Sequence, residues 1–190
     1  WQFSLDYLTQ NKSRISFNYL FDEFTFDKSQ MESGKEKFNA YSLKIIKSLI
    51  RNDEHLLNLY FSQIMIGKNT FRHENGLNNF VHRNKPLGHS FGSDFKLNSF
   101  GVNSFYKSKI LTQVEIGSKR QGLNTILIKP YERYDFSNTN INDTDHFHFV
   151  NLNIDYWYEE NISLFLRTEY NIQSSEKQNT SFILGLNIYY

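Results

Sequence analysis

The 190-residue sequence contains no cysteine, only two prolines and no long apolar run. Without cysteine there is neither a disulfide framework nor a thiol site, and the cellular compartment is left open. No segment approaches the roughly 20 consecutive apolar residues of a membrane helix. The formal net charge is +1 and the charges are dispersed, which argues against a nucleic-acid partner because such a partner normally requires a basic face.

Aromatic residues are abundant instead, at 17% of the chain and mostly Phe and Tyr, which favours β-strands. Segments that alternate apolar and polar residues recur, and the final three are the clearest. In residues 162–172 the aliphatic side chains share one face, whereas Arg167 and Glu169 lie on the other. About nine or ten such segments predict an all-β fold, an antiparallel up-and-down meander in one domain spanning residues 1–190.

Several stretches are less regular. Residues 37–50 and 55–67 read as two strands joined by an RNDE turn, but Tyr41, Ile45 and Leu49 also fit helical spacing, so an amphipathic helix pair is the alternative. Lys107–Ser108 is expected to be a hairpin turn. SKRQG at 118–122 is expected to be a polar turn before a short strand at 124–130.

Two long connections interrupt the alternation, one inserted at residues 68–95 and a second at 130–145. The first contains four phenylalanines, which argue against disorder because large aromatic side chains favour burial. Connections of this length are uncommon in compact domains and are usually functional or disordered. We therefore expect the first loop to pack against the polar side of the sheet, or across its mouth.

The strand length and the two-faced pattern indicate a membrane barrel. Strands of about ten residues suffice to cross a bilayer when tilted, and charged side chains on the opposite face need a polar lumen. Short turns alternate with longer loops, which is typical of such barrels. The pattern predicts a transmembrane β-barrel whose apolar face contacts membrane lipid. A soluble antiparallel sandwich has the same period and is the alternative.

Both ends of the chain continue the strand pattern. Trp1, Phe3, Leu5 and Tyr7 alternate from the first residue, and no Met precedes them, so we expect a fragment of a longer protein whose first strand lies at an open sheet edge. The last strand resembles the C-terminal signal that the insertion machinery of bacterial outer-membrane barrels recognises. The residues that match it are Phe182, Leu184, Leu186, Ile188 and Tyr190.

Two sequence stretches carry a more particular likeness. FRHENGLNNFVHRNKPLGHSFGSDF, at 71–95, resembles a segment of Wzi-type capsule-assembly proteins of Bacteroidetes and of related gliding-associated outer-membrane proteins. YLFDEFTFD, at 19–27, is similar to their FxxDEFxxD-type strand. The resemblance implies a closed, many-stranded barrel in the bacterial outer membrane that helps attach or organise surface polysaccharide, with a link to gliding motility. The present chain would form only its C-terminal part.

Polar side chains beside aromatic ones in the first long loop form the candidate binding site. Sugars are recognised in this way, by hydrogen bonds to hydroxyl groups and by ring faces against C–H surfaces. Alternatively, the same groups satisfy one another in a loop folded into the lumen. The candidate residues are His73, Asn75, His82, Arg83, His89 and Asp94.

Metal binding and catalysis find little support. His146 and His148 share one face of a strand, but only Asp145 lies nearby as a further ligand, so solvated histidines are favoured over a metal site. Asp22 and Glu23 are adjacent and face opposite ways, which argues against a shared acid/base site. No nucleophile, phosphate, dinucleotide or zinc-protease motif is present, so we expect no catalytic residues, no cofactor and no enzymatic activity.

Three functions remain in competition. The first is a non-enzymatic outer-membrane barrel for capsule or surface-polysaccharide assembly or attachment. The second is a generic outer-membrane channel or transporter barrel, and the third is a soluble carbohydrate-binding β-sandwich. Detergent-dependent solubility separates the third function from the other two.

Overall fold

The structure is a computed structural model that describes residues 1–23, 38–71, 81–83, 85–122, 125–126, 144–173 and 178–189. Every regular element in these residues is a β-strand. The strands are β1 (Gln2–Leu8), β2 (Ser13–Glu23), β3 (Phe38–Arg51), β4 (His55–Ile66), β5 (Val81–His82), β6 (Lys85–Pro86), β7 (Phe95–Tyr106), β8 (Ile110–Gly122), β9 (Thr144–Glu159), β10 (Ile162–Gln173) and β11 (Gln178–Ile188). Within the described ranges, no helix has the length and hydropathy that a membrane crossing requires.

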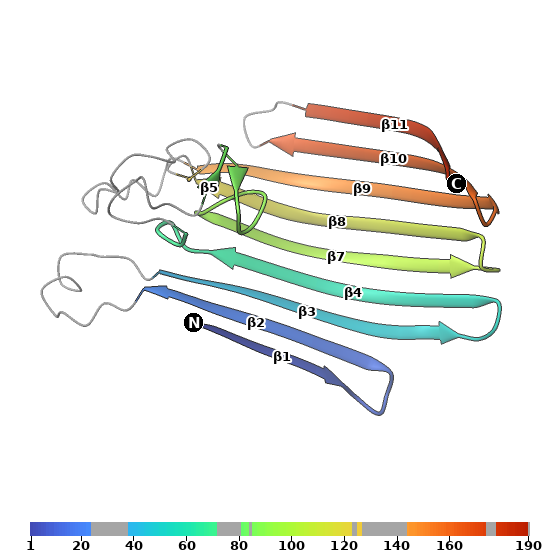
Figure 1. Cartoon of the computed structure of the whole chain (residues 1–190), viewed down its shortest axis with the longest axis horizontal. Coiled ribbons are helices and arrows are strands. Elements are labelled where there is room, and N and C mark those ends of the chain that lie inside the picture. The colour runs from blue at the N-terminus through green and yellow to red at the C-terminus, as the bar shows by residue number, and fades with distance from the viewer. Residues whose placement is uncertain are drawn as a thin grey trace, which may run out of the picture.

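Nine of the strands form one antiparallel sheet in the order β1-β2-β3-β4-β7-β8-β9-β10-β11, and β5 and β6 pair separately as a small hairpin (Figure 1). Each long strand therefore pairs with its neighbours along the chain, which confirms the all-β antiparallel meander. β1 and β11 lie at the two edges, so the described residues form an open sheet, and the expected edge position of the first strand is confirmed.

The ambiguous segments around residues 37–67 are the strands β3 and β4, so the helical alternative is wrong. Their ladder runs from Ala40 opposite Ile66 to Arg51 opposite Leu56, with one register shift between Ser48 and Ile50. The helical spacing of Tyr41, Ile45 and Leu49 does not produce a helix, because β3 also pairs with β2 and β4 also pairs with β7. These ladders satisfy the backbone N–H and C=O groups on the outer sides of the two strands.

The SKRQG segment is also a strand rather than a turn, because β8 continues to Gly122. Ser118 pairs with Asn98 of β7 and with His148 of β9, so this polar stretch meets polar neighbours on both sides. Residues 144–145 open β9, which shortens the expected second loop. The rest of that loop, and most of the expected short strand at 124–130, lie outside the described residues.

The register of β2 against β3 shifts between Phe21 and Glu23, near the end of β2. The hairpin turn expected at Lys107–Ser108 is confirmed. At the β7–β8 turn, Lys107 and Ser108 have φ angles of 48° and 55°, and the Lys109 N–H donates to the Tyr106 carbonyl at 3.0 Å. Two successive positive φ angles match the right-handed twist of a hairpin.

The pairing register separates two faces of the sheet. On one face, here called the apolar face, large apolar side chains occur on every strand of the sheet from β1 to β11. It includes Leu5, Phe17, Leu43, Phe61, Phe100, Val114, Leu152, Leu166 and Leu184. The other, the polar face, carries a small buried cluster of Ala40, Ile66 and Phe95, with Leu20 and Leu97 packed against it. The buried hydrophobic cluster, and Phe71 of the inserted segment that packs against it, therefore lie on the polar face.

Candidate functional site

The described part of the inserted segment crosses the polar face of the sheet. Residues 87–94, here called the strap, lead from β6 into β7, where Phe95 is 1% exposed. The Asp94 N–H donates to the Gly67 carbonyl at 3.2 Å, and the Gly122 N–H donates to the Asp94 carbonyl at 2.8 Å. Positive φ angles at Gly92 and Asp94 turn the chain into this position. The strap is therefore anchored to the ends of β4 and β8.

Three rings stack along the strap. Phe91 lies almost parallel to Phe95, with ring centroids 4.5 Å apart and an interplanar angle of 8°. The His89 ring stacks on Phe95 at 5.2 Å, and its Nδ1 accepts the Phe91 N–H at 3.3 Å. Burial of the imidazole lowers the pKa of His89, because desolvation penalises the charged form. His89 is therefore held as a neutral ring at neutral pH.

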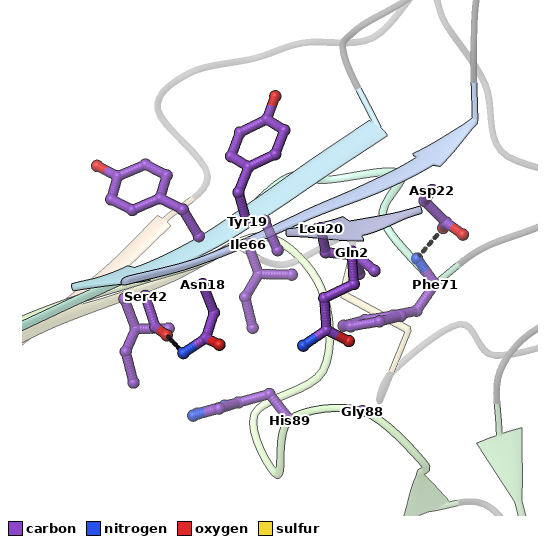
Figure 2. A pocket seen from close by; sticks show the side chains of 13 residues that line it. Gln2, Asn18, Tyr19, Leu20, Asp22, Ser42, Ile66, Phe71, Gly88 and His89 are labelled. Atoms are coloured by element: carbon purple, nitrogen blue, oxygen red, sulfur yellow. Dashed lines mark hydrogen bonds between the residues drawn. The ribbon is translucent and has the colours of Figure 1, made fainter. Parts of the chain in front are cut away.

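One hollow, the His89 hollow, opens between the strap and β1–β4, and has a volume of about 720 Å³. Asn18, Ser42 and Gln2 point from the sheet toward His89, whereas Tyr19 points away on the other side (Figure 2). Asn18 Nδ2 donates to Ser42 Oγ at 3.2 Å. The hollow thus has amide and hydroxyl groups on one wall and an imidazole on the other.

Phe71 forms one end of the His89 hollow in an unusual backbone conformation. Its φ is 66°, a left-handed value that costs a bulky residue of order 1–3 kcal/mol. The Phe71 N–H donates to Asp22 Oδ2 at 2.7 Å (Figure 2). The ring lies against Gly88, where a Cβ would come within 2.6 Å of it. Asp22 is therefore placed to hold backbone geometry, and glycine at position 88 gives the ring its space.

A second hollow, the Lys119 hollow, opens on the other side of the strap over β8–β11, with a volume of about 340 Å³. The Lys119 ammonium lies 5.4–5.8 Å from the ring centroids of Phe91, Phe147 and Phe149 and 3.5 Å from Glu169 Oε1. Cation–π attraction and the carboxylate together fix this ammonium. The lining residues are Phe91, Phe95, Lys119, Gln121, Thr125, Asp145, Phe147, Asn171 and Asn179.

Two ion pairs elsewhere on the polar face join neighbouring strands. Arg167 forms an ion pair with Asp155 and also donates to the carbonyls of Ile154 and Leu166, each at 3.1 Å. Arg14 forms a two-point ion pair with Asp6 near the β1 edge. The expectation that Arg167 and Glu169 share the face opposite the apolar residues is confirmed.

The sequence candidates separate into three groups. His89 and Asp94 lie in the strap on the polar face, and Asp94 Oδ1 accepts from Arg120 at 3.4 Å. His82 and Arg83 are exposed on the β5–β6 hairpin. His73 and Asn75 lie outside the described residues.

The proposed insertion signal lies on β11. Phe182, Leu184, Leu186 and Ile188 share one face and are all more than half exposed at the sheet edge. Tyr190 lies outside the described residues.

The paired histidines of β9 lie on the apolar-face side. His146 Nε2 is 3.1 Å from Thr144 Oγ1, and both histidines are exposed. Among the residues that the structure describes, no cluster of three metal-ligating side chains occurs.

The sequence does not mark the Lys119 hollow, because its residues come from both expected long loops, the expected turn at 118–122 and separate strands. The available signal was Phe147 and Phe149, two aromatic residues on the face of β9 that also carries Asn151, Asn153 and Asp155; Phe149 pairs directly with Asn171.

No protein-family model matches the chain, and neither a curated protein nor a solved structure matches it significantly.

Proposed function

We propose that this chain forms part of the wall of a bacterial outer-membrane β-barrel, with the apolar face toward lipid and the polar face toward the lumen, and that the protein serves surface-polysaccharide assembly or attachment. No enzymatic step is assigned to it. The observation that carries the barrel part is the geometry of the apolar band, which slants across the sheet.

The slant is visible in two rows of directly paired residues. One row is apolar in β1–β3 and polar from β4 to β9, and runs through Leu5, Phe17, Leu43, Gln63, Asn98, Ser118 and His148. A second row, four residues away along the strands, shows the opposite change, because it is polar in β2–β3 and largely apolar afterwards. It runs through Ser13, Lys47, Leu59, Val102, Val114 and Leu152. The apolar band therefore crosses the rows diagonally.

A tilted strand produces this diagonal. The row containing Leu5 reaches β11 at Gln178, six residues before Leu184 at the centre of the apolar stretch of that strand. Six residues span about 20 Å and eight strand spacings about 38 Å, which gives an angle of about 30°. Strands of membrane barrels tilt by roughly 35–45°, so a band parallel to the membrane must cross the rows at a similar angle.

The opposite face supports the same orientation. Arg167 with Asp155 and Lys119 with Glu169 are partly exposed ion pairs that need water or a polar lumen. Three glycines of this face pair directly with aromatic residues, an arrangement that favours a sheet bent toward the glycine side. A soluble sandwich is disfavoured because, among the described residues, no second sheet packs against the apolar face.

The polysaccharide part of the proposal is supported by the strap and its His89 hollow. Ring faces, amides and a hydroxyl converge there, which is the chemistry that sugar recognition uses. The resemblance of residues 71–95 to the capsule-assembly family supports the same role, but no matching family model adds to it.

The barrel part is tested by placing a charge on each face. We expect Leu166→Arg to destabilise the membrane-folded protein by about 2–4 kcal/mol, because it puts a cation at mid-bilayer. Ser181→Arg is the matched control, since Ser181 pairs with Glu169 on the polar face of β10–β11. Urea titration of folding into lipid vesicles measures both variants. Equal, small effects at the two sites would argue against a lipid-facing band.

The polysaccharide part is tested in cells. Replacing Arg83 and His89 by Ala should reduce the amount of polysaccharide retained at the surface, while the barrel keeps its heat-resistant electrophoretic mobility. Arg51→Ala with His55→Ala is the control pair, because it removes the same residue types beside the β3–β4 turn. Unchanged retention in the first pair refutes a role in glycan contact, and loss of folding assigns these residues a structural role instead.

A further inference from the structure

We infer that the Lys119 hollow binds one uncharged pyranose ring of a glycan. The inference rests on the proposed function for the source of the glycan, but it concerns a second site, separated from the His89 hollow by the strap. Its volume of about 340 Å³ lies near the lower end of the roughly 300–1,000 Å³ of small-molecule sites, so it suits a single ring.

Two buried acceptor atoms in the polar lining have no hydrogen-bond partner among the described residues. Gln121 Nε2 donates to the Ser93 carbonyl at 3.2 Å and Asn171 Nδ2 donates to Glu169 at 2.8 Å, so both amide groups are fixed through nitrogen. Their oxygens, Gln121 Oε1 and Asn171 Oδ1, accept no hydrogen bond in the described part of the chain, although both are shielded from solvent. An unmet buried acceptor costs about 1–3 kcal/mol. A ligand hydroxyl that donated to one of these oxygens, after a small movement of the Gln121 or Asn171 side chain, would remove that cost.

The apolar lining supplies a flat surface beside these acceptors. Phe91 stacks on the buried Phe95 and is itself 37% exposed, and Phe147 of β9 also lines the hollow. A ligand must therefore present hydroxyl donors along its rim and an apolar surface on its face. A pyranose has both, since its hydroxyl groups point outward and its axial C–H groups form a face that packs on aromatic rings.

The charges of the hollow favour an uncharged sugar over a uronic acid. Lys119 is already neutralised by Glu169 at 3.5 Å, and its ammonium is enclosed by three rings. Asp145 adds a carboxylate to the lining, where it accepts from Gln173 at 2.9 Å. The carboxylates of Asp145 and Glu169 would repel an anionic ligand, and the Lys119 ammonium is already paired with Glu169. We therefore expect the hollow to exclude acidic sugars.

The test uses the intact protein in a detergent without a sugar headgroup, and saturation-transfer NMR with methyl β-glucoside, methyl β-galactoside and methyl N-acetyl-β-glucosaminide as probes. At least one probe should receive saturation on its axial C–H protons. Affinity for that probe should fall at least tenfold in Phe147→Leu and in Asn171→Leu. Asn151→Leu is the matched control, because it removes another unpartnered buried amide of the polar face outside the hollow.

Each outcome decides the inference separately from the proposed function. Absence of transfer to all three probes, or equal binding by the Asn171 and Asn151 variants, overturns the sugar site even if the protein still folds into membranes. Tighter binding of methyl β-glucuronide than of the neutral probes overturns the assignment of an uncharged ring. Specific sugar binding by a protein that stays soluble without detergent supports the site while refuting the barrel.

Discussion

Three glycines on the polar face each lie directly opposite an aromatic residue of the next strand. The pairs are Tyr60 with Gly101, Phe149 with Gly117, and Phe165 with Gly185. In each pair the ring lies over the glycine so closely that a Cβ would overlap it. The aromatic ring thus covers backbone that glycine leaves open, which explains why glycine is tolerated in the middle of these strands.

The Tyr60–Gly101 pair gives a prediction at the residue scale. Gly101→Ala should destabilise the protein by about 1–3 kcal/mol, because the new methyl group forces the Tyr60 ring to move. Tyr60 also accepts a hydrogen bond from Gln113 at 3.0 Å, which the movement would strain. A double-mutant cycle with Tyr60→Leu, measured by urea unfolding, should show that most of the cost disappears when the ring is removed. Additive effects would mean that the two residues are not in contact.

His89 gives a second prediction at this scale. Its pKa in the folded protein lies below the ordinary 6.5 because the ring is desolvated in the strap. The unfolded or opened state therefore binds the proton more readily, so the stability of the strap is full above pH 6.5 and falls as the pH drops toward the folded-state pKa. Protease sensitivity of the strap should rise on acidification, and His89→Gln should remove the pH dependence. A histidine NMR titration that gives a pKa above 6.5 would contradict this.

At the scale of elements, strand periodicity predicted most of the sheet. The last three strands were recognised because aliphatic and polar residues alternate through most of residues 150–158, 162–172 and 182–190. The end of β8 was missed because Ser118 to Gly122 are polar on both faces, so no alternation marks them as a strand. Pairing with Asn98 and His148 decides that structure, and sequence periodicity cannot show such tertiary pairing.

The candidate site was predicted less completely than the strands, for the same reason. Aromatic residues in the inserted segment indicated that it packs on the sheet, and the stack of His89, Phe91 and Phe95 bears this out. Which strands it meets depends on register. The Lys119 hollow brings together residues from the strap and from β8 to β11, and Lys119 and Asn171 are more than 50 residues apart in the sequence.

At the scale of the whole molecule, the two faces of one sheet divide its chemistry. The apolar face forms a slanted band and the polar face carries ion pairs, the strap and two hollows. In the proposed barrel this division places lipid on one side and glycan on the other. The slant matters most, because a soluble sheet has no reason to change from apolar to polar along a single row of paired residues.

The depth of residues along one such row tests the account most directly. Phe17 and Ser118 lie on the same hydrogen-bonded row, in β2 and β8. In an otherwise cysteine-free protein reconstituted in bilayers, a fluorophore on Phe17→Cys should be strongly quenched by lipids brominated near mid-chain. The same fluorophore on Ser118→Cys should be quenched weakly and should remain accessible to an aqueous quencher. Equal depth at the two sites, or aqueous access at both, would contradict a tilted strand wall in the membrane.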